Sequence, residues 1–318
     1  MVGTLERVNW KMRLVRMMGR MQWLRLGVRR RFVKMFYPPE SAPEREFLVD
    51  FSGLKYRGSL ASFIDWHVFF FGGYELAELD VIEDVTAAIR SCVSLDVGAN
   101  VGHHTLIIAK HSAQVHAFEP LPALRRHALD QMALNSMERV EIHPFGLGAE
   151  TISIPYHFNS ASRNRGTGSF VASHDPRADT HENLDIVRGD DWFAEAGVRG
   201  VDFVKVDVEG FEADVLMGLS GALAKYQPVI LVEITGTAAE GFDRHGGFSA
   251  VIPFAAEYFR VATAPHLLGV LSTGRYRLSP VPDPKPEKHS YNVLVIPHRR
   301  RDILARLTGR WSSSRRAR

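Results

Sequence analysis

Residues 95–105 read Leu-Asp-Val-Gly-Ala-Asn-Val-Gly-His-His-Thr, and this stretch decides the fold. The apolar pair Cys92-Val93 precedes it, and residues 106–109 follow it as the buried side of a helix. The order is a strand, a glycine turn and a helix N-terminus, an arrangement in which backbone N–H groups approach a ligand closely. The next apolar run, residues 115–118, ends at Glu119-Pro120, where a carboxylate can accept hydrogen bonds from both hydroxyls of a ribose. Together the two strand ends indicate a nucleoside cofactor.

The side chains of the turn distinguish two classes of nucleoside cofactor. A nicotinamide dinucleotide fingerprint needs three glycines, and the middle one makes room for a pyrophosphate. Here the glycines are Gly98 and Gly102, and Asn100 stands between them, where its side chain would crowd a pyrophosphate. Asp96 would also face the phosphates with a like charge, whereas a carboxylate there suits an amino group or a sulfonium. The pattern resembles the motif of class I S-adenosylmethionine (SAM) methyltransferases.

A second run, residues 201–212, reads Val-Asp-Phe-Val-Lys-Val-Asp-Val-Glu-Gly-Phe-Glu and places acids at the end of another buried strand. Asp207 stands at its carboxyl end, where open α/β sheets bind their ligands, and Glu209 follows two residues later. The strand expected at 229–234 brings Glu233 to the same edge. We therefore expect these three carboxylates to converge near the cofactor crevice, and we expect Glu212 to be a solvated residue at a helix start.

Alternating strands and helices predict an α/β fold with a mostly parallel sheet. Strands are expected at 92–97, 115–118, 140–143, 201–206, 229–234 and 291–296, and helices near 103–111, 121–135 and 211–224. The polar residues 157–190 are too many for a simple connection, so they indicate a hairpin insertion or a lid over the site. The domain itself is expected to span residues 91–298, after a lead-in segment at 37–90.

Several of these stretches occur in the order and spacing of FkbM-type SAM-dependent methyltransferases, and the chain resembles that family over residues 70–297. The stretches are Asp96 to Gly102, Phe118 to Pro120, Val201 to Phe211, Val229 to Glu233 and Tyr291 to Pro297, with Tyr74-Glu75 as the upstream element. The resemblance implies a Rossmann-like, seven-stranded sheet with helices on both faces. It also implies methyl transfer from SAM to a hydroxyl of a sugar, glycolipid, polyketide or similar metabolite. Two departures are His103-His104 after the turn and the long polar segment 157–190.

The candidate site residues fall into two groups. The cofactor would be bound by Asp96, Gly98, Asn100, Gly102, Glu119, Pro120 and Glu75. O-methylation also needs in-line alignment of the acceptor and removal of its proton. Asp207 and Glu209 are candidates for proton acceptance and acceptor positioning, with Glu233 in support. His103 or His104 is a further candidate base. Alternatively, Asp207, Glu209 and Glu233 hold a divalent metal, for which all-oxygen ligands suit Mg²⁺.

Two other classes of function remain open at this point. One is a nicotinamide-dependent oxidoreductase, but the turn at residues 98–102 lacks the middle glycine of the dinucleotide fingerprint. A non-enzymatic adaptor, with basic arms that bind membrane or nucleic acid around an inert core, would not need the intact set of Asp96, Gly98, Gly102 and Glu119. Nucleic acid is disfavoured as the acceptor, because a nucleic-acid channel should be basic near its active site.

Charge is strongly partitioned along the 318-residue chain. Residues 1–35 carry a net charge of +9 and residues 299–318 a net charge of +7, whereas residues 36–298 carry −13. Such basic arms attract anionic surfaces. In the N-terminal arm, residues 1–36, an apolar stripe recurs at helical spacing beside several arginines. This pattern is typical of a helix that lies on a membrane surface, docks on a partner or packs on its own domain. The stripe is Trp10, Leu14, Met17, Met21, Leu24 and Val28. The C-terminal arm, residues 299–318, is expected to be a basic tail.

Composition sets the remaining limits. Hydrophobic residues make up 45% and charged residues 24% of the chain, as in an ordinary globular enzyme. A single cysteine, Cys92, excludes an internal disulfide framework. The start of the chain lacks the continuous apolar region of a signal peptide. A cytoplasmic location, with membrane-peripheral contact through the N-terminal arm, is therefore expected.

Overall fold

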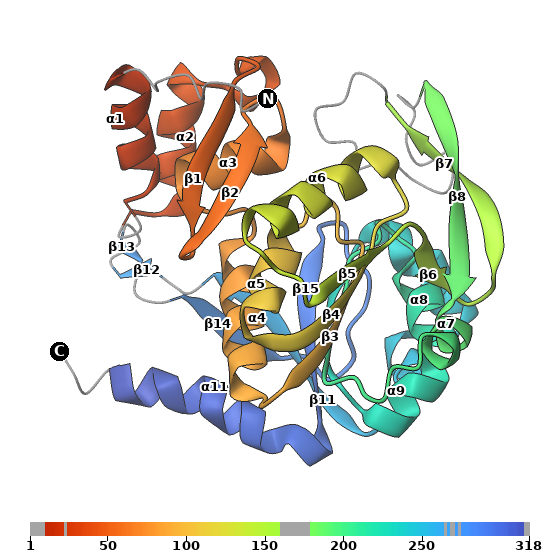
Figure 1. Cartoon of the computed structure of the whole chain (residues 1–318). Coiled ribbons are helices and arrows are strands. Elements are labelled where there is room, and N and C mark those ends of the chain that lie inside the picture. Colours follow the sequence, from red (N-terminus) through yellow and green to blue (C-terminus); the bar gives the residue numbers. More distant parts are fainter. Residues whose placement is uncertain are drawn as a thin grey trace.

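The computed structural model describes residues 10–21, 24–159, 179–263, 266–267, 271–272 and 275–314. Its centre is an eight-stranded sheet with helices on both faces, so the fold is α/β (Figure 1). The strands lie in the order β14 (Tyr276–Pro280), β11 (Ala256–Thr263), β15 (Tyr291–Pro297), β10 (Val229–Ile234), β9 (Phe203–Val206), β3 (Cys92–Val97), β4 (Ser112–Phe118) and β5 (Val140–His143). The pairs from β10 to β5 are parallel, and the pairs that link β10, β15, β11 and β14 are antiparallel.

The sheet differs from the predicted seven-stranded, mostly parallel one in having eight strands and an antiparallel side. Strands β11 and β14 were not predicted, because their half-exposed residues alternate instead of forming a continuous apolar run. The predicted helix over 211–224 is two helices, α8 (Glu212–Gly218) and α9 (Ser220–Tyr226). They part beside Gly218, where a Cβ atom would lie 1.8 Å from the Gly148 carbonyl oxygen.

Two hydrophobic cores cover the two faces of the sheet. Strand β10 shows the division, because Val229 and Leu231 pack into one core and Ile230 and Val232 into the other. This alternation of neighbouring residues follows from the pleat of a strand buried on both sides. The helices around the sheet are α4 (Leu76–Ala88), α5 (His103–His111), α6 (Pro122–Leu134), α7 (Gly189–Glu195), α8, α9, α10 (Ala239–Arg244) and α11 (Arg301–Ser314).

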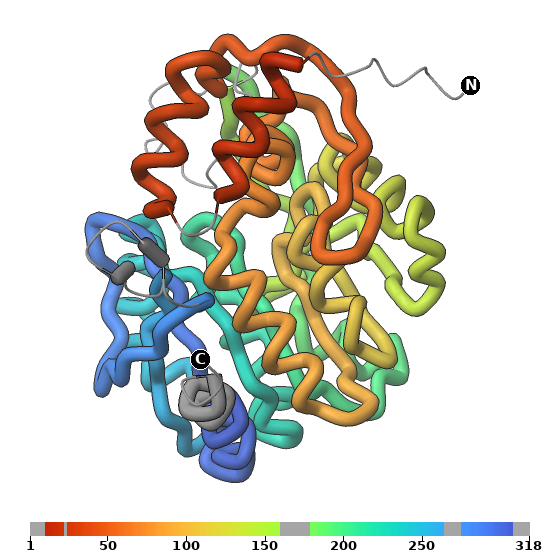
Figure 2. The backbone as a smooth tube through the Cα atoms, turned by 90° about the vertical axis from the view of Figure 1, so that its left-hand side faces the viewer, coloured from red at the N-terminus to blue at the C-terminus, as the bar shows by residue number. Residues whose placement is uncertain are grey.

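The N-terminal residues form a small layer that shares the first core. It consists of α1 (Trp10–Gly19), α2 (Leu26–Phe36), the hairpin of β1 (Glu46–Phe51) and β2 (Leu54–Ser59), and α3 (Phe63–Phe71). Helices α1 and α2 run side by side at one end of the molecule (Figure 2). The prediction of a single continuous helical stripe from Trp10 to Val28 is wrong, since the chain leaves the helix after Gly19. The Gly19 carbonyl accepts a hydrogen bond from the buried Arg29 of α2, at 2.8 Å, which closes the two-helix turn.

The segment predicted as a hairpin or lid has strands at its two ends. Strand β7 (Ile152–Phe158) pairs antiparallel with β8 (Thr180–Arg188), which also pairs with β6 (Gly146–Gly148). Residues 160–178, between them, lie outside the described residues. A further small hairpin joins β12 (His266–Leu267) and β13 (Leu271–Ser272).

The basic C-terminal arm is largely helical where it is described, because α11 begins at Arg301 and buries Ile303 and Leu307. The four last residues, 315–318, lie outside the described part of the chain. No helix of the described residues is long and apolar enough to cross a membrane.

Candidate active site

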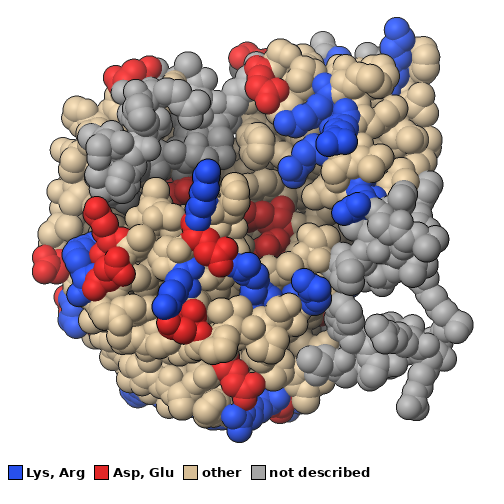
Figure 3. Space-filling view, turned by 180° about the vertical axis from the view of Figure 1, so that it is seen from behind, with Lys and Arg blue, Asp and Glu red and all other residues tan. Residues whose placement is uncertain are grey.

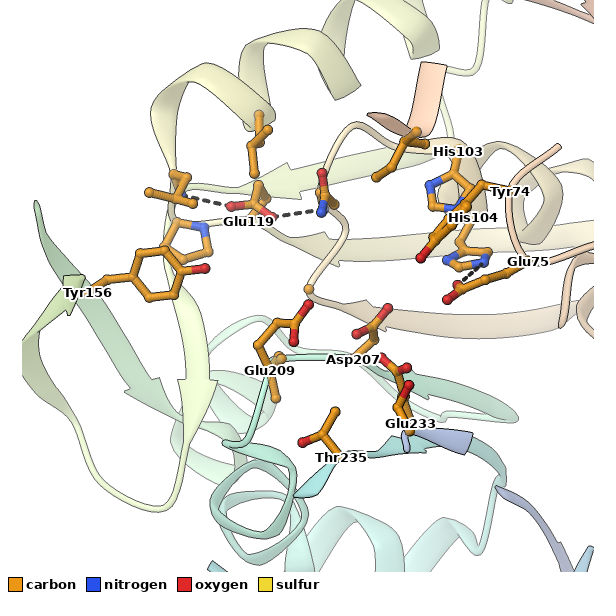
Figure 4. Close-up of a pocket in the computed structure, with 18 of the residues that line it drawn as sticks. Tyr74, Glu75, His103, His104, Glu119, Tyr156, Asp207, Glu209, Glu233 and Thr235 are labelled. Carbon is orange, nitrogen blue, oxygen red and sulfur yellow. Dashed lines mark hydrogen bonds and ion pairs between the residues drawn. The ribbon is translucent and has the colours of Figure 1, made fainter. Parts of the chain in front are cut away.

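A cavity of about 1010 Å³, including its open mouth, lies at the carboxyl ends of β3, β4, β9 and β10 (Figure 4). Eight of the ten residues predicted for the site line it, namely Glu75, Gly98, Asn100, Glu119, Pro120, Asp207, Glu209 and Glu233. The other two, Asp96 and Gly102, lie behind the wall. Because the strand ends are fixed by the buried sheet, the fold brings these residues together from positions as far apart as 75 and 233.

The glycine turn is shaped by its contact with the next strand. Gly98 has a φ of +85°, and a Cβ atom there would lie 1.8 Å from the Asp207 carbonyl oxygen. The Asp207 amide also donates to the Val97 carbonyl at 3.0 Å. Gly98 therefore lets the ends of β3 and β9 close on each other. Gly102, at φ +81°, instead allows α5 to approach Ala128 of α6, which a Cβ atom would meet at 3.0 Å.

The amides of the turn are all used within the protein, contrary to the expectation that they face a ligand. Gly98 and Ala99 donate to the Phe118 carbonyl, and Gly102 donates to the Ala99 carbonyl. The Asn100 amide donates to Glu119 Oε2 at 2.8 Å, and the Val101 amide donates to Asn100 Oδ1 at 2.9 Å. The turn thus offers no free N–H groups to a pyrophosphate, which argues against a dinucleotide.

Glu119 is held rigidly at one end of the cavity. Its two carboxylate oxygens each accept one backbone hydrogen bond, from Asn100 and from Leu121 (2.9 Å). Each oxygen keeps a second lone pair, so the carboxylate can still accept from two hydroxyl groups. Burial raises the pKa of Glu119 to about 7, although the two backbone hydrogen bonds act in the opposite direction. Apolar side chains lie beside it, from Pro120, Leu121, Leu124, Tyr156 and Leu184.

The middle of the cavity is acidic. Burial works to raise the pKa of Asp207, but the Lys205 charge and a hydrogen bond from Glu233 outweigh burial and hold this pKa below its usual range. The pKa of Glu233 is raised to about 10, first by burial and then by the Asp207 charge. Burial, followed by the charges of Asp207 and Glu212, raises the pKa of Glu209 to about 8. Asp207 is thus ionised at neutral pH, while Glu233 carries a proton and Glu209 titrates close to neutrality.

Asp96 and Lys205 lie directly behind this acidic wall. Lys205 is buried on β9, with its Nζ 3.0 Å from Asp207 Oδ2 and 4.0 Å from Asp96 Oδ1. The hydroxyl of Thr105 donates to Asp96 Oδ2 at 2.6 Å. The structure therefore places Asp96 as a neighbour of Lys205 beneath the turn.

The opposite end of the cavity is formed by Tyr74, Glu75, His103 and His104 (Figure 4). His104 Nε2 lies 3.5 Å from Glu75 Oε2. Both ring nitrogens of His103 are buried without a hydrogen-bond partner among the described residues. Burial lowers the pKa of His103 to about 3, so the ring is neutral and can donate from one nitrogen and accept at the other. This end of the cavity suits a polar ligand.

The predicted magnesium set is not brought into a coordinating arrangement. In the part of the chain that the structure describes, ligand atoms within 4.8 Å of one another occur in Glu75–His103–His104 and in His116–Glu141–His143. Asp207, Glu209 and Glu233 do not form such a group.

Glu212 was also placed wrongly, as a solvated residue. Its side chain is fully buried, and its Oε1 accepts the Gly210 amide at 3.0 Å, so it supports the turn that carries Glu209.

Sequence reasoning missed several residues of the site. No role was predicted for Lys205, although a lysine two positions before Asp207 on a buried strand must point to the same face of the sheet as Asp207. Tyr156 and Leu184 come from β7 and β8, and Thr235 and Ser290 from loops near the sheet edge. No local signal in the sequence marks these four residues, because tertiary folding brings them to the cavity.

The fold and the cavity define an α/β protein with a nucleoside-cofactor crevice of the class I methyltransferase kind. The chain belongs to the methyltransferase FkbM domain family, because the sequence model of that family matches residues 96–277.

Curated relatives match a smaller part of the chain. It is 33% identical over 158 residues to Methyltransferase 1 of Beauveria bassiana, a match that covers 44% of this chain and 64% of the relative. It is 32% identical over 143 residues to the hexuronic acid methyltransferase AglP of Haloferax volcanii, a match that covers 43% of this chain and 53% of the relative. It is 31% identical over 157 residues to the 31-O-demethyl-FK506 methyltransferase FkbM of Streptomyces tacrolimicus, a match that covers 41% of this chain and 60% of the relative. The chain thus spans between about half and two thirds of these relatives.

Among solved structures, the chain is similar to a methyltransferase FkbM from Methylobacillus flagellatus. It is 15% identical, with a TM-score of 0.39, and the match covers 65% of this chain and 44% of that one. A SAM-dependent methyltransferase from Agrobacterium tumefaciens is 10% identical, with a TM-score of 0.45, covering 81% and 72%.

The contact of Gly98 with β9 predicts a specific effect of Gly98→Ala. The added methyl group would overlap the Asp207 carbonyl, so the two strand ends must separate. We expect the free energy of unfolding to fall by about 2 kcal/mol or more, together with loss of S-adenosylhomocysteine binding. Gly53→Ala is the matched control, because Gly53 has a similar φ of +82° but no atom within 4 Å of the added carbon. Equal losses in the two variants, measured by urea unfolding, would contradict the role of the contact.

The environment of Glu119 predicts a pH-dependent affinity. Its protonated form accepts hydrogen bonds less well, so the affinity for S-adenosylhomocysteine should fall about tenfold per pH unit below about 7. Glu119→Gln should weaken binding by roughly 10- to 100-fold at pH 8 and abolish this part of the pH dependence. Calorimetric titration at several pH values measures both effects, with the exposed Glu240→Gln as control. An unchanged pH profile in Glu119→Gln would rule out this contact.

Proposed function

We propose that this protein transfers the methyl group of SAM to a hydroxyl oxygen of a small-molecule or glycan acceptor. The observation that carries the proposal is the charge of the cavity. Five carboxyl groups line it, from Glu75, Glu119, Asp207, Glu209 and Glu233, and no lysine or arginine is among its described lining residues. A sulfonium with a nearby amino group is the cationic kind of nucleoside ligand that such a cavity suits.

The parts of the cavity match the parts of this cofactor. The apolar side chains around Tyr156 suit an adenine ring, and the free lone pairs of Glu119 suit its ribose hydroxyls. Gly98 leaves the cavity open beside Asp207, in its acidic middle. When bound, SAM supplies an electrophilic methyl group on a sulfonium, so the protein needs to align the acceptor and take its proton.

Glu209 is the proton acceptor in this proposal. A general base works best when its pKa lies near the operating pH, and Glu209, at about 8, is better matched than the always ionised Asp207. As the acceptor oxygen bonds to the methyl carbon, the carbon–sulfur bond breaks and the acceptor proton passes to Glu209. Glu233 and Thr235, with the neutral His103 across the cavity, provide donors and acceptors for an acceptor with several hydroxyl groups.

The curated relatives support an oxygen acceptor. Besides the hexuronic acid and FK506 methyltransferases, the chain is 25% identical over 146 residues to the 2-O-methyltransferase NoeI of Sinorhizobium fredii. Their names include acceptors of two chemical classes, a sugar acid and the 31-O position of FK506. The polar end of the cavity favours a hydroxylated acceptor for this chain too.

Ligand binding tests the cofactor assignment first. We expect S-adenosylhomocysteine to bind the purified protein in calorimetric titration, and NAD to show no heat of binding, because the turn amides are already engaged. Binding of NAD alone would support the oxidoreductase alternative. Binding of neither ligand would support the non-enzymatic adaptor and contradict the proposal.

The variant Glu209→Gln tests the catalytic assignment. We expect kcat for methyl transfer to fall by about 10²- to 10⁴-fold, with the Kd of S-adenosylhomocysteine nearly unchanged. In the natural protein kcat/KM, which reports the free enzyme, should rise with pH through about 8, because the carboxylate form of Glu209 accepts the proton, and this rise should vanish in the variant. Glu240→Gln, at an exposed residue that does not line the cavity, should leave both kcat and the Kd of S-adenosylhomocysteine unchanged. A full rate in Glu209→Gln would exclude Glu209 as the base.

A further inference from the structure

The structure shows an unusual surface on the helical hairpin formed by α1 and α2. The face of α1 that packs inward carries Met12, Val15 and Gly19, not the apolar stripe that the sequence suggests. Trp10, Leu14 and Met17, spaced by four and three residues, instead form an outward stripe, and Trp10 is 70% exposed. The hairpin therefore has apolar residues on both its inner and its outer surface.

Helix α2 repeats this arrangement. Val33 is buried against α1, whereas Val28, Met35 and Phe36 face outward, and Met35 is 68% exposed. Six of the nine exposed large hydrophobic residues of the described chain lie on these two helices. Such a concentration on a protein surface marks an interaction site more often than chance exposure does. We call these six residues and the exposed bases among them the hairpin face.

Most of the lysines and arginines of the two helices remain exposed in the folded protein. Residues 10–36 contain nine lysines and arginines and no acid. Three of them are used inside the protein: Arg16 and Arg20 donate to carbonyls of α3, and Arg29 donates to Gly19. The six others are exposed, namely Lys11, Arg13, Arg25, Arg30, Arg31 and Lys34, and of these Lys34 lies 4.0 Å from the exposed Glu40. In Figure 3, Lys and Arg gather at the upper right, over the N-terminal part of the molecule, and acidic side chains lie in a hollow near the middle.

We propose that the hairpin face docks on the surface of an anionic lipid membrane. Exposed aromatic and aliphatic side chains flanked by arginines and lysines match the boundary between headgroups and acyl chains, where the apolar groups insert and the bases meet phosphates. Nucleic acid fits less well, because Leu14, Met17 and Met35 would have no partner on a phosphate backbone. The acidic cavity also disfavours a polyanion near the site.

Docking through this face would bring the site to the membrane. Arg16 Nε donates to the Phe69 carbonyl at 3.1 Å, and Arg20 to the Val68 carbonyl at 3.2 Å, so the hairpin is fastened to α3. Ile64, in the first turn of α3, lines the cavity. The hairpin is therefore attached to a helix that contributes to the cavity wall. If methyl transfer takes place there, its acceptor is presented at the lipid surface.

Co-sedimentation with lipid vesicles tests the proposal on the full chain. Vesicles of phosphatidylcholine alone are compared with vesicles that also contain phosphatidylglycerol. We expect binding to the mixed vesicles only, weakened about tenfold or more by high salt, because the bases are exposed. A Trp10-dependent blue shift of fluorescence on binding, taken as the difference between the natural protein and Trp10→Phe, should report insertion of the stripe.

Two sets of variants separate the contributions. Trp10→Ser/Leu14→Ser/Met17→Ser removes the stripe, and Arg13→Gln/Arg30→Gln/Arg31→Gln removes charge. Each should reduce vesicle binding about tenfold or more. Leu129→Ser, at an equally exposed leucine of α6, is the matched control and should bind as the natural protein does. S-adenosylhomocysteine affinity, measured in each variant, reports folding and the cofactor site independently of docking.

Three results would overturn the proposal. Undiminished vesicle binding by both triple variants would place the lipid contact elsewhere. A dimer in solution that becomes monomeric in the Trp10/Leu14/Met17 variant would show that the face pairs with a second copy. Binding to single-stranded RNA that depends on the bases but not on the stripe, without vesicle binding, would assign the face to nucleic acid.

Discussion

The ion pair between Lys205 and Asp207 is the interaction on which the site depends. Both groups lie at the end of β9, and their separation of 3.0 Å lets one buried cation offset the acids around it. A buried ammonium is stable only when paired, and Lys205 faces Asp96 as well as Asp207. The negative charges of Asp207, Glu75 and Asp96 keep the Lys205 pKa raised despite burial, and the lysine in turn keeps Asp207 ionised. Without this pair, the ends of β3 and β9 would carry only mutually repelling carboxylates.

The remaining carboxyl groups limit the negative charge of the empty cavity by holding protons. Glu233 holds a proton that it shares with Asp207, and burial brings the pKa values of Glu119 and Glu209 close to neutrality. Every one of these carboxyl groups becomes easier to ionise when a cation enters. Binding of a sulfonium should therefore release protons, and it should lower the pKa of Glu209 from its value in the empty cavity. The cavity is thus complementary to a positively charged ligand.

The parts of this arrangement that the sequence predicted are those set by local order along a strand. Asp96, Glu119, Asp207 and Glu233 each follow an apolar run, and parallel strands deliver such residues to one edge. What the sequence left undetermined depends on distant contacts. The role of Gly98 in admitting the Asp207 carbonyl and the use of the turn amides by Phe118 became visible only when β3, β4 and β9 were placed side by side.

The same reason explains the two errors at the periphery. Helical spacing shows that Trp10, Leu14 and Met17 share a face, but it does not show whether this face turns inward, since Met12 and Val15 form an equally good apolar stripe. The strands β11 and β14 resemble surface segments until β15 provides an edge for β11, and β11 in turn provides an edge for β14. Periodicity establishes which residues lie together, whereas the packing partner establishes which way they face.

Electrostatics then restricts how the molecule can approach a negative surface. The body between residues 36 and 298 carries a net charge of −13 and is repelled. Bases of the C-terminal arm are partly engaged, since Arg300 pairs with Asp202, Arg301 lies 2.8 Å from Glu257, and Arg306 donates to the Ala88 carbonyl. The hairpin bases combine exposure with the absence of acids from residues 10–36. Long-range attraction should therefore orient the hairpin toward the surface before any apolar side chain inserts. In this view the charge of the hairpin sets the orientation of the protein at the membrane, and insertion of the apolar stripe sets how long the protein stays bound.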